Sequence, residues 1–535
     1  MEDGEARHGG GLNLGPGGGG EDLISALPED LLLQILVRLR CARAAARTST
    51  VSRRWRALWT RLPELTFRDV ALGPLLRALA SLQAAAAGAG VPLLDICIVP
   101  IFFDSHDENA QFREGVSSLL HAATRLSPVE LCFAVRPEIF TRSYMDVKAP
   151  LFHRATSIEL HGLHLAFPGS PPRWLRLHLA PSTRLDRVYT DPRDTFPALE
   201  RLSLSSCSVD LTDLVLRCPR LRVLREADGP QYSDIIIRSA TLQELDMKSD
   251  TPFMFCIHIQ APALKQLALS FSTGGGITVA VSILAPLLEK VSWWCRYTTV
   301  TVGLGRWGLY KVTLKPAESN AQRDLTRSGE DDCLQHPHAH VLSLYSFAHI
   351  SFSFPEAAAE LTTEIEKHTI IHFSVLELHF MTRGHVFGAL ALHILGMHRI
   401  SSATRSLKIV LSKEDKEACP VNCTCDEPRN WRSQSISLTN LESVEIKGFE
   451  GENHEFDFLE LIFRCATMLK RVTVRPSDEV TTSNDWCTKI YGFFKAYPFV
   501  KCNLDLSPGK HVVHAQLDCS YIQQWLLSLY SSIEA

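Results

Sequence analysis

The chain lacks the features that would send it to a membrane, out of the cell or onto a polyanion. Its 55 lysines and arginines are balanced by 59 aspartates and glutamates, so no global positive charge attracts nucleic acid or anionic lipid. The glycine-rich first twenty residues contain no signal peptide, and we expect them to be disordered. The most apolar stretch, residues 91–103, is interrupted by prolines and an aspartate and is too short to cross a bilayer. We therefore expect no membrane partner and a location in the cytoplasm or nucleus.

The sequence also lacks a disulfide framework and the common catalytic motifs. Its 15 cysteines are spread singly along a chain without an export signal, which favours reduced and mostly buried thiols. GxSxG, HExxH and a phosphate-binding P-loop are all absent. The segment GLGRWG at residues 303–308 matches a dinucleotide-binding pattern, but the strand-like residues on both sides favour a hairpin turn. We expect no enzyme activity and no cofactor.

Possible metal ligands are present, but their spacing is not that of a zinc motif. Cys419, Cys423 and Cys425 form a CxxxCxC pattern, and three histidines at residues 336–340 lie about eighty residues before it. A structural zinc site normally shows two short pairs of ligands. We therefore expect no metal site.

What the sequence does contain is a pair of apolar helices near its start. Pro28, Glu29 and Asp30 predict a helix start, because proline fits the first helical position and carboxylates favour the positive end of the helix dipole. Leucines and an isoleucine then recur at helical spacing and extend beyond one face. A later helix, beginning after Ser52 and ending before Pro63, carries tryptophans and leucines at the same spacing. A segment of this length cannot bury all of these side chains alone. We therefore expect a partner protein to cover some of them.

This segment resembles the F-box, the motif by which substrate receptors join Skp-cullin-F-box ubiquitin ligases. The resemblance rests on LPEDLLLQILVRL and ARTSTVSRRWRALW, within residues 22–65. Where the motif usually has a proline and then an acidic residue after the first helix, this chain has Arg40 and Arg43. The resemblance implies binding to a Skp-type adaptor, itself held by a cullin; periodicity leaves open whether each bulky residue faces that partner or the core. The implied adaptor-binding residues are Leu27, Pro28, Leu32, Ile35, Leu36, Leu39, Val51, Ser52, Trp55, Leu58 and Trp59.

The same segment is rich in arginine, and no acidic residue lies between Arg38 and Arg61. Such a stretch can bind nucleic acid. Arginines around an apolar stripe are more often a solvated helix face, and the resemblance places them against an acidic adaptor or the chain's own carboxylates. We therefore expect no nucleic-acid partner.

After residue 65, helix-like and strand-like segments alternate. GPLLRALASLQAAAAGAG predicts a helix, and LLDICIV predicts a buried strand. Aligning PALERLSL, PRLRVLRE, ATLQELDM, PALKQLAL and PLLEKVSW places leucines 22, 21, 22 and 24 residues apart. This period is typical of leucine-rich repeats, whose short strands bury alternate leucines only when neighbouring repeats stack on them. The aligned residues are Leu199, Leu221, Leu242, Leu264 and Leu288.

Weaker copies of this pattern begin at residues 155, 373, 403, 439 and 467, so the array should run almost to the end. The polar residues 315–340 predict an exposed loop. CPVNCTCDEPRNW, residues 419–431, and the segment after it are similar to the FBD region of plant F-box proteins. A last helix would cap the array through Ile522, Trp525, Leu526 and Leu529.

These patterns predict an α+β protein, with a small N-terminal helical F-box followed by an irregular α/β leucine-rich-repeat solenoid. The order of parts resembles a plant family of F-box proteins with leucine-rich repeats and a C-terminal FBD region. It implies a non-catalytic substrate receptor of a ubiquitin ligase, whose repeats bind an unknown target protein. The alternative is an interaction scaffold in which the N-terminal helices cap the array and no ligase is attached. The expected divisions are a disordered N-terminus (1–20), an F-box (21–66), a leucine-rich-repeat array (67–400), an FBD region continuing the array (401–480) and a capping segment (481–535).

Overall fold

The structure is a computed structural model, and it describes the chain in a series of segments. The expected disordered N-terminus (1–20) and the expected capping helix around Trp525 lie outside these segments. The described residues are 27–85, 90–99, 106–136, 145–148, 150–166, 195–207, 209–227, 234–249, 254–274, 279–298, 302–317, 339–349, 358–412, 419–420, 423–477, 484–505 and 513–514.

Short helical segments form the N-terminal region. The predicted first helix is confirmed as α2 (Glu29–Arg38), with Pro28 as its N-cap and not as its first helical residue. The alanine-rich segment after it forms helix α3 (Ala42–Arg47), which continues into the 3-10 turn η1 (Thr48–Thr50). The prediction of an α-helix after Ser52 is wrong. Residues 51–57 form turns, and only a 3-10 helix, η2 (Leu58–Arg61), follows them.

The apolar side chains of this segment are nevertheless buried in the core, as their spacing predicts. Backbone N–H groups donate three residues back, from Leu58 to Trp55 and from Leu62 to Trp59, so the chain makes tighter 3-10 turns. Trp55, Leu58, Trp59 and Leu62 are all buried. The apolar spacing identified the buried residues, but a spacing of three or four does not separate an α-helix from successive 3-10 turns.

The strands that follow form one long open sheet, 18-stranded within the described residues. Its members are β1 (Glu64–Arg68), β2 (Leu93–Ile98), β3 (Glu130–Val135), β5 (Ser157–His161), β7 (Arg201–Ser205), β8 (Val223–Ala227), β10 (Glu244–Ser249), β12 (Gln266–Thr273), β14 (Lys290–Tyr297), β15 (Gly303–Leu304), β16 (Trp307–Pro316), β17 (His340–Ala348), β18 (Val375–Met381), β19 (Ser406–Ser412), β20 (Ser443–Phe449), β21 (Arg471–Pro476), β22 (Lys501–Leu504) and β23 (Val513–His514). Strands β1 to β14 pair in parallel, each with the next member of the sheet along the chain, and so do β17 to β22. Antiparallel pairs join β14 to β16, β15 to β16, β16 to β17 and β22 to β23, so the sheet is mixed.

The leucine alignment predicts both the central strands and their register. Each aligned leucine lies two residues before a strand: Leu199 before β7, Leu221 before β8, Leu242 before β10, Leu264 before β12 and Leu288 before β14. The first residues of these strands are paired across the sheet, from Arg201 of β7 through to Lys290 of β14. The weaker copies likewise contain strands β5, β18, β19, β20 and β21.

The connections between these strands were less regular than expected. Helices connect the first strands, a second parallel sheet of β9, β11 and β13 runs beside the middle strands, and helices return beyond β17. The second sheet was not predicted. The bounds are α4 (Leu72–Ala85), α5 (His106–Arg125), α7 (Leu211–Leu216), β9 (Asp234–Arg238), β11 (Cys256–Gln260), β13 (Ala280–Leu284), α8 (Ala358–Lys367), α9 (Gly388–Gly396), α10 (His398–Ala403), η3 (Thr424–Asp426), η4 (Arg429–Ser433), α11 (Asn453–Cys465) and α12 (Asn484–Lys495), with β4 (Met145–Lys148) and β6 (Leu163–Ala166) pairing separately.

The glycine-rich segment GLGRWG lies within the antiparallel part of the sheet formed by β14 to β17. Gly303 pairs with Gly308, and Leu304 pairs with Trp307, so the predicted hairpin turn is confirmed. Gly305 has a φ of 56°, the left-handed conformation that favours glycine. The loop expected at residues 315–340 begins and ends in strands β16 and β17, and its residues 318–338 lie outside the described part.

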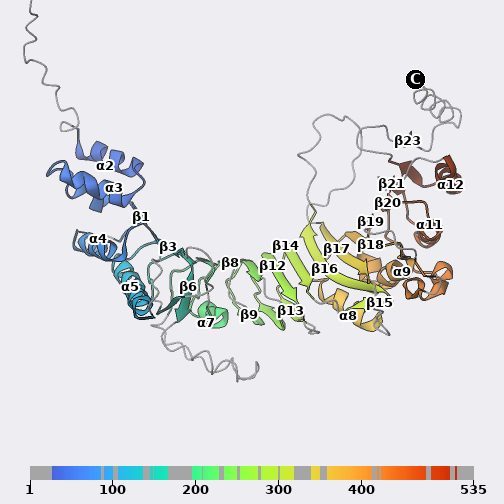
Figure 1. Ribbon diagram of the computed structural model, residues 1–535, viewed down its shortest axis with the longest axis horizontal. Coiled ribbons are helices and arrows are strands. Elements are labelled where there is room, and N and C mark those ends of the chain that lie inside the picture. The colour runs from blue at the N-terminus through green and yellow to red at the C-terminus, as the bar shows by residue number, and fades with distance from the viewer. Residues whose placement is uncertain are drawn as a thin grey trace, which may run out of the picture.

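The described segments together form an arc (Figure 1). The N-terminal helices occupy one end and α11 and α12 the other, while strands such as β12, β14 and β16 line the inner side and α5, α7 and α8 the outer side (Figure 1). One continuous apolar core runs from Leu32 to Leu504. Within the described segments, the helices are either too short or too polar to cross a membrane.

Candidate functional site

Helix α2 has a buried side that fixes it to the rest of the helical region. Leu32 and Leu36 lie one turn apart and are fully buried. The helix packs against η2, where Leu58 is also buried. The Arg61 guanidinium pairs with the Glu29 carboxylate at 2.9 Å and so joins η2 to the start of α2.

A second apolar stripe of α2 faces away from this core. Leu31, Ile35 and Leu39 follow one another at four-residue spacing, which places them on one side of the helix. Their exposed fractions are 42%, 41% and 42%. Pro28, just before the first turn, is also exposed. We call Pro28, Leu31, Ile35 and Leu39 the α2 stripe.

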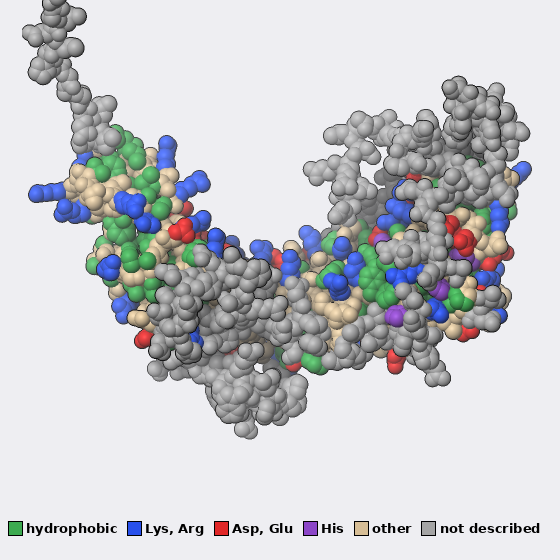
Figure 2. Space-filling model, in the orientation of Figure 1, with side chains coloured by type: hydrophobic (Ala, Val, Ile, Leu, Met, Phe, Trp, Pro, Cys, Tyr) green, Lys and Arg blue, Asp and Glu red, His purple; other side chains and the backbone are tan. Residues whose placement is uncertain are grey.

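The surface of this region is basic as well as apolar. Figure 2 shows basic side chains, all of them arginines in this region, gathered over the N-terminal helical end of the molecule. Within the segments that the structure describes, six exposed arginines there form no ion pair: Arg38, Arg40, Arg43, Arg47, Arg53 and Arg56. An apolar stripe on a basic surface suits a partner that offers an apolar groove and acidic side chains.

The structure divides the residues that the F-box resemblance implies. The exposed or partly exposed ones are Leu27, Pro28, Ile35, Leu39, Val51 and Ser52. The buried ones are Leu32, Leu36, Trp55, Leu58 and Trp59. The buried group lies in the chain's own core and supports the surface from behind, so direct contact with an adaptor stays a prediction for the exposed group. Leu31 is not among the predicted adaptor-binding residues, although it lies four residues before Ile35 in the sequence.

The turn after α2 is formed without the usual proline. Arg40 has a φ of 48°, and its N–H donates to the Val37 carbonyl at 3.2 Å. A left-handed residue just beyond the last helical turn is a common helix ending. Arg43, which replaces the usual acidic residue, donates to the Asp69 carbonyl at the end of β1.

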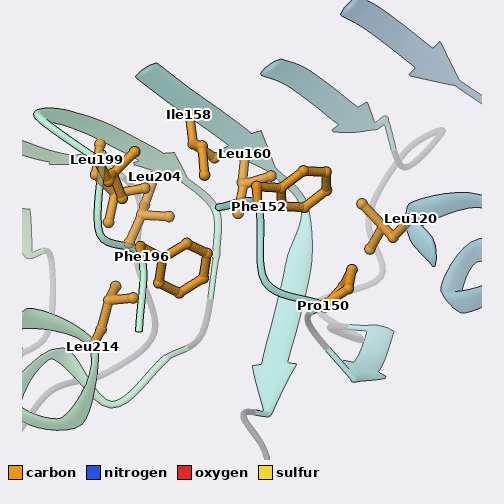
Figure 3. Close-up of a pocket in the computed structure, with 10 residues that line it drawn as sticks. Leu120, Pro150, Phe152, Ile158, Leu160, Phe196, Leu199, Leu204 and Leu214 are labelled. Atoms are coloured by element: carbon orange, nitrogen blue, oxygen red, sulfur yellow. The ribbon is translucent and has the colours of Figure 1, made fainter. Parts of the chain in front are cut away.

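A hollow between the long sheet and its outer layer is wholly apolar (Figure 3). A ligand site normally includes a few polar groups that fix orientation. This hollow offers no polar side chain, so it is a packing gap in the core. Its lining residues are Leu120, Pro150, Phe152, Ile158, Leu160, Phe196, Leu199, Leu202, Leu204 and Leu214.

The inner face of the sheet carries linked polar and aromatic side chains. Lys311 Nζ lies 3.6 Å from the centre of the Tyr345 ring, and that ring stacks on His379 at 4.1 Å. Beside them, Glu377 accepts from Lys408 Nζ at 2.7 Å. Hydrogen bonds from His379 and Lys408 outweigh burial and lower the pKa of Glu377 to about 2. This face presents cations, a carboxylate and aromatic rings side by side.

A buried polar group between β14 and α8 superficially resembles an acid–base site. The Tyr297 hydroxyl donates to Glu364 at 2.9 Å and lies 2.8 Å from His368 Nε2. The Trp293 indole donates to His368 Nδ1 at 2.9 Å. All of these side chains are buried, which leaves no access for a substrate. The group therefore fastens α8 to the sheet.

The cysteines of the CxxxCxC segment converge on a histidine that spacing did not indicate. Of the three histidines that the sequence suggested, His340 is buried in β17 and accepts the Val291 N–H at 3.2 Å, while residues 336 and 338 lie outside the described part. The ligand atoms of the converging group lie within 4.8 Å of one another. Its members are His385, Cys419, Cys423 and Cys425.

Family models match segments near both ends of the chain. An F-box-like model matches residues 24–62, which include α2, α3 and η2. An FBD model matches residues 437–474, which include β20 and α11. The first match contains the α2 stripe.

Relatives in Arabidopsis thaliana carry the same parts in their names. The F-box/FBD/LRR-repeat protein At2g04230 is 35% identical over 293 residues, covering 48% of this chain and 59% of the relative. The putative F-box/FBD/LRR-repeat protein At3g49030 is 57% identical over 47 residues, covering 9% of this chain and 10% of the relative, so the chain spans less than two thirds of either. The putative F-box/FBD/LRR-repeat protein At4g03220 is 23% identical over 495 residues, covering 85% of this chain and 89% of the relative. The chain thus carries an F-box-like segment and an FBD segment, the same parts that these Arabidopsis relatives carry in their names.

Proposed function

We propose that the protein is the substrate-recognition subunit of a Skp-cullin-F-box ubiquitin ligase and that the α2 stripe binds the Skp-type adaptor. The observation that carries the proposal is an exposed apolar stripe inside the segment that matches the F-box-like model. Covering this stripe removes apolar surface from water, which contributes about 25 cal/mol per Å². The exposed arginines favour an acidic partner and speed its approach. The cullin is reached only through the adaptor.

In this proposal the stacked strands are an irregular leucine-rich-repeat solenoid (67–400) that the FBD region (401–480) continues. Its inner face holds a target protein, and the Lys311, Tyr345 and Glu377 group supplies polar contacts there. The chain contributes no reactive group. It raises the effective concentration of target lysines near the conjugating enzyme. The described cysteines carry no disulfide, which fits the cytoplasm or nucleus as the place of action.

The test compares two apolar residues on opposite sides of the same helix. Ile35 belongs to the α2 stripe, whereas Val37 is equally exposed, at 41%, but points away from it. Ile35→Glu should weaken binding of a purified Skp-type adaptor by roughly 30-fold or more, as expected for a central anchor worth about 2 kcal/mol. Val37→Glu should bind nearly as the unchanged protein does. Titration calorimetry measures both affinities, and circular dichroism checks that both variants are folded.

Equal binding of the two variants would show that the α2 stripe is not the adaptor surface. If the unchanged protein binds no adaptor and recovers no cullin from plant extract, the alternative of an interaction scaffold without a ligase is favoured. In that case the apolar stripe must be covered by another part of the chain. Protection of Ile35 from solvent in the free protein would show this.

A further inference from the structure

We propose that His385, Cys419, Cys423 and Cys425 bind one Zn²⁺ ion. The site lies at the edge of the long sheet where β18 and β19 end. These strands are parallel neighbours, so the segments that leave them emerge at the same edge. His385 follows β18, and the three cysteines follow β19. The Thr382 N–H donates to the Ser412 carbonyl at 2.8 Å and ties the two strand ends together just below the site.

The ligand atoms lie close to the spacing of a compact tetrahedral site. Cys419 Sγ and Cys423 Sγ lie 3.2 Å and 3.3 Å from His385 Nδ1. Cys419 Sγ lies 3.4 Å from Cys425 Sγ. Tetrahedral zinc with bonds of about 2.3 Å to sulfur separates its ligands by about 3.8 Å. An outward shift of a few tenths of an ångström therefore admits the ion without moving the backbone.

The chemistry of this set favours zinc in a structural role. Three thiolates and one imidazole fill the four positions of tetrahedral zinc and leave none open for water or substrate. His385, Cys423 and Cys425 are buried, so the ligands are held away from solvent. A disulfide is not formed, because the 3.4 Å between the sulfurs of Cys419 and Cys425 greatly exceeds a bond of about 2.05 Å.

The backbone around the site is already arranged to present these ligands. His385 sits in a tight turn in which Arg383 and Gly384 have φ values of 46° and 82°, and its N–H donates to the Thr382 carbonyl at 2.7 Å. The Cys423 N–H donates to the Pro420 carbonyl at 3.1 Å. On the far side, a Cβ at Gly305 would lie 2.6 Å from the Thr424 carbonyl, so the GLGRWG hairpin presses closely on the cysteine segment.

The ion would join the segment of η3 and η4 to the sheet. The same segment is held by Trp431, whose indole donates to Asp426 at 2.7 Å and whose ring leaves no room for a side chain at Gly388 of α9. A bond between His385 and Cys419 closes a loop of 34 residues, so the ion restricts the unfolded chain as a disulfide would. The site thus stabilises the entry to the FBD region and is independent of adaptor binding by α2.

The test measures metal in the full-length protein produced with zinc supplied. Mass spectrometry of the metal should give one zinc per chain, and Co²⁺ in its place should show the visible bands of tetrahedral cobalt with a thiolate charge-transfer band. Cys423→Ser and His385→Ala should each lose the equivalent of zinc. Cys465→Ser, a buried cysteine in α11 outside the group, should keep it. Adaptor binding by the zinc-depleted protein should be unchanged, which separates this proposal from the proposed function.

Several results would overturn the zinc site. The first is a failure of the unchanged protein to bind either zinc or cobalt under reducing conditions. This measurement does not depend on the folding of any variant. The second is full retention of zinc in folded Cys423→Ser and His385→Ala. The third is a disulfide between Cys419 and Cys425 in protein isolated without reductant and carrying no metal.

Discussion

Ile35 and Leu36 are neighbours in sequence with opposite surroundings. Ile35 is 41% exposed, whereas Leu36 is 1% exposed against the 3-10 turns that follow Ser52. A residue that contacts only a partner affects binding, while a residue in the core affects the fold. Substitutions within one turn of α2 can therefore separate partner binding from the stability of the fold.

We predict that Leu36→Ala lowers the free energy of unfolding of the helical region by about 2–5 kcal/mol, because it leaves a cavity in a packed core. Ile35→Ala should change it by less than about 0.5 kcal/mol. Hydrogen exchange of the backbone amides in α2 measures both variants. Comparable acceleration of exchange in the two would mean that Ile35 is also a core residue.

Helical spacing predicted the apolar character of α2 but not which side is buried. Leu32 and Leu36 repeat at four residues, and so do Leu31 and Ile35. Burial separates the two stripes, since Leu32 and Leu36 are buried whereas Leu31 and Ile35 are about two fifths exposed, and η2 is the element that packs against α2. Since η2 was expected as an α-helix, its position could not be derived from the sequence.

A second residue-scale prediction concerns pH. The pKa of Glu377 is lowered to about 2 from an ordinary value of 4.5, chiefly by the hydrogen bond from His379 and also by Lys408. A lowered carboxyl pKa stabilises the folded state above pH 4.5, and this contribution is lost as the pH falls towards 2. Glu377→Gln should therefore be less stable than the unchanged protein at pH 6, and the difference should shrink by pH 3. Urea midpoints at the two pH values measure it.

Glu64→Gln, at an exposed carboxylate of β1, provides the comparison. A Glu377→Gln deficit that stays constant from pH 6 to pH 3 would contradict the lowered pKa.

At the scale of the element, leucine spacing predicted strands well because burial of alternate residues is a local requirement. Leu199, Leu221, Leu242 and Leu264 are buried and precede strands in one register. The connecting segments obey no such local rule. They need only cover the outer side of the core, and both α7 and β9 do so. The second sheet therefore depends on neighbouring connections pairing with each other, which a single repeat does not reveal.

The cysteine group likewise depends on a contact between distant segments that local sequence patterns do not reveal. The CxxxCxC spacing was visible in the sequence, but the fourth ligand is set by the parallel pairing of β18 with β19. His385 lies 34 residues before Cys419, and no short motif spans that distance.

The start of α11 supports a prediction at this scale. The Glu455 carboxylate accepts the N–H groups of Glu450, Gly451 and Glu452 at 3.0, 2.7 and 2.9 Å and is buried. Glu455→Ala leaves these donors without their acceptor and should lower the free energy of unfolding by about 1–3 kcal/mol. Glu455→Gln keeps one acceptor oxygen and should cost less. Thermal unfolding ranks the two, and the reverse order would show that the carboxylate is not the cap.

At the scale of the whole molecule, contacts run mainly between neighbours. From β1 to β14 and from β17 to β22, each strand of the long sheet pairs with the member before and after it. In such an arrangement stability is close to a sum of local terms and neighbouring interfaces. The N-terminal helices and the FBD region lie at opposite ends of the arc (Figure 1). A lesion at one end should therefore leave the other intact.

We predict that Trp431→Ala opens the C-terminal end alone. The residue is fully buried, its ring contacts α9, and its loss should cost about 3–5 kcal/mol locally. Hydrogen exchange should then accelerate by roughly 100-fold or more in η3, η4, α9 and α11, since 1.4 kcal/mol corresponds to about tenfold. Amides of β1, β2 and β3 should exchange as in the unchanged protein, and adaptor binding should persist. Equal acceleration in β1 to β3 would mean that the continuous core from Leu32 to Leu504 unfolds as one cooperative unit.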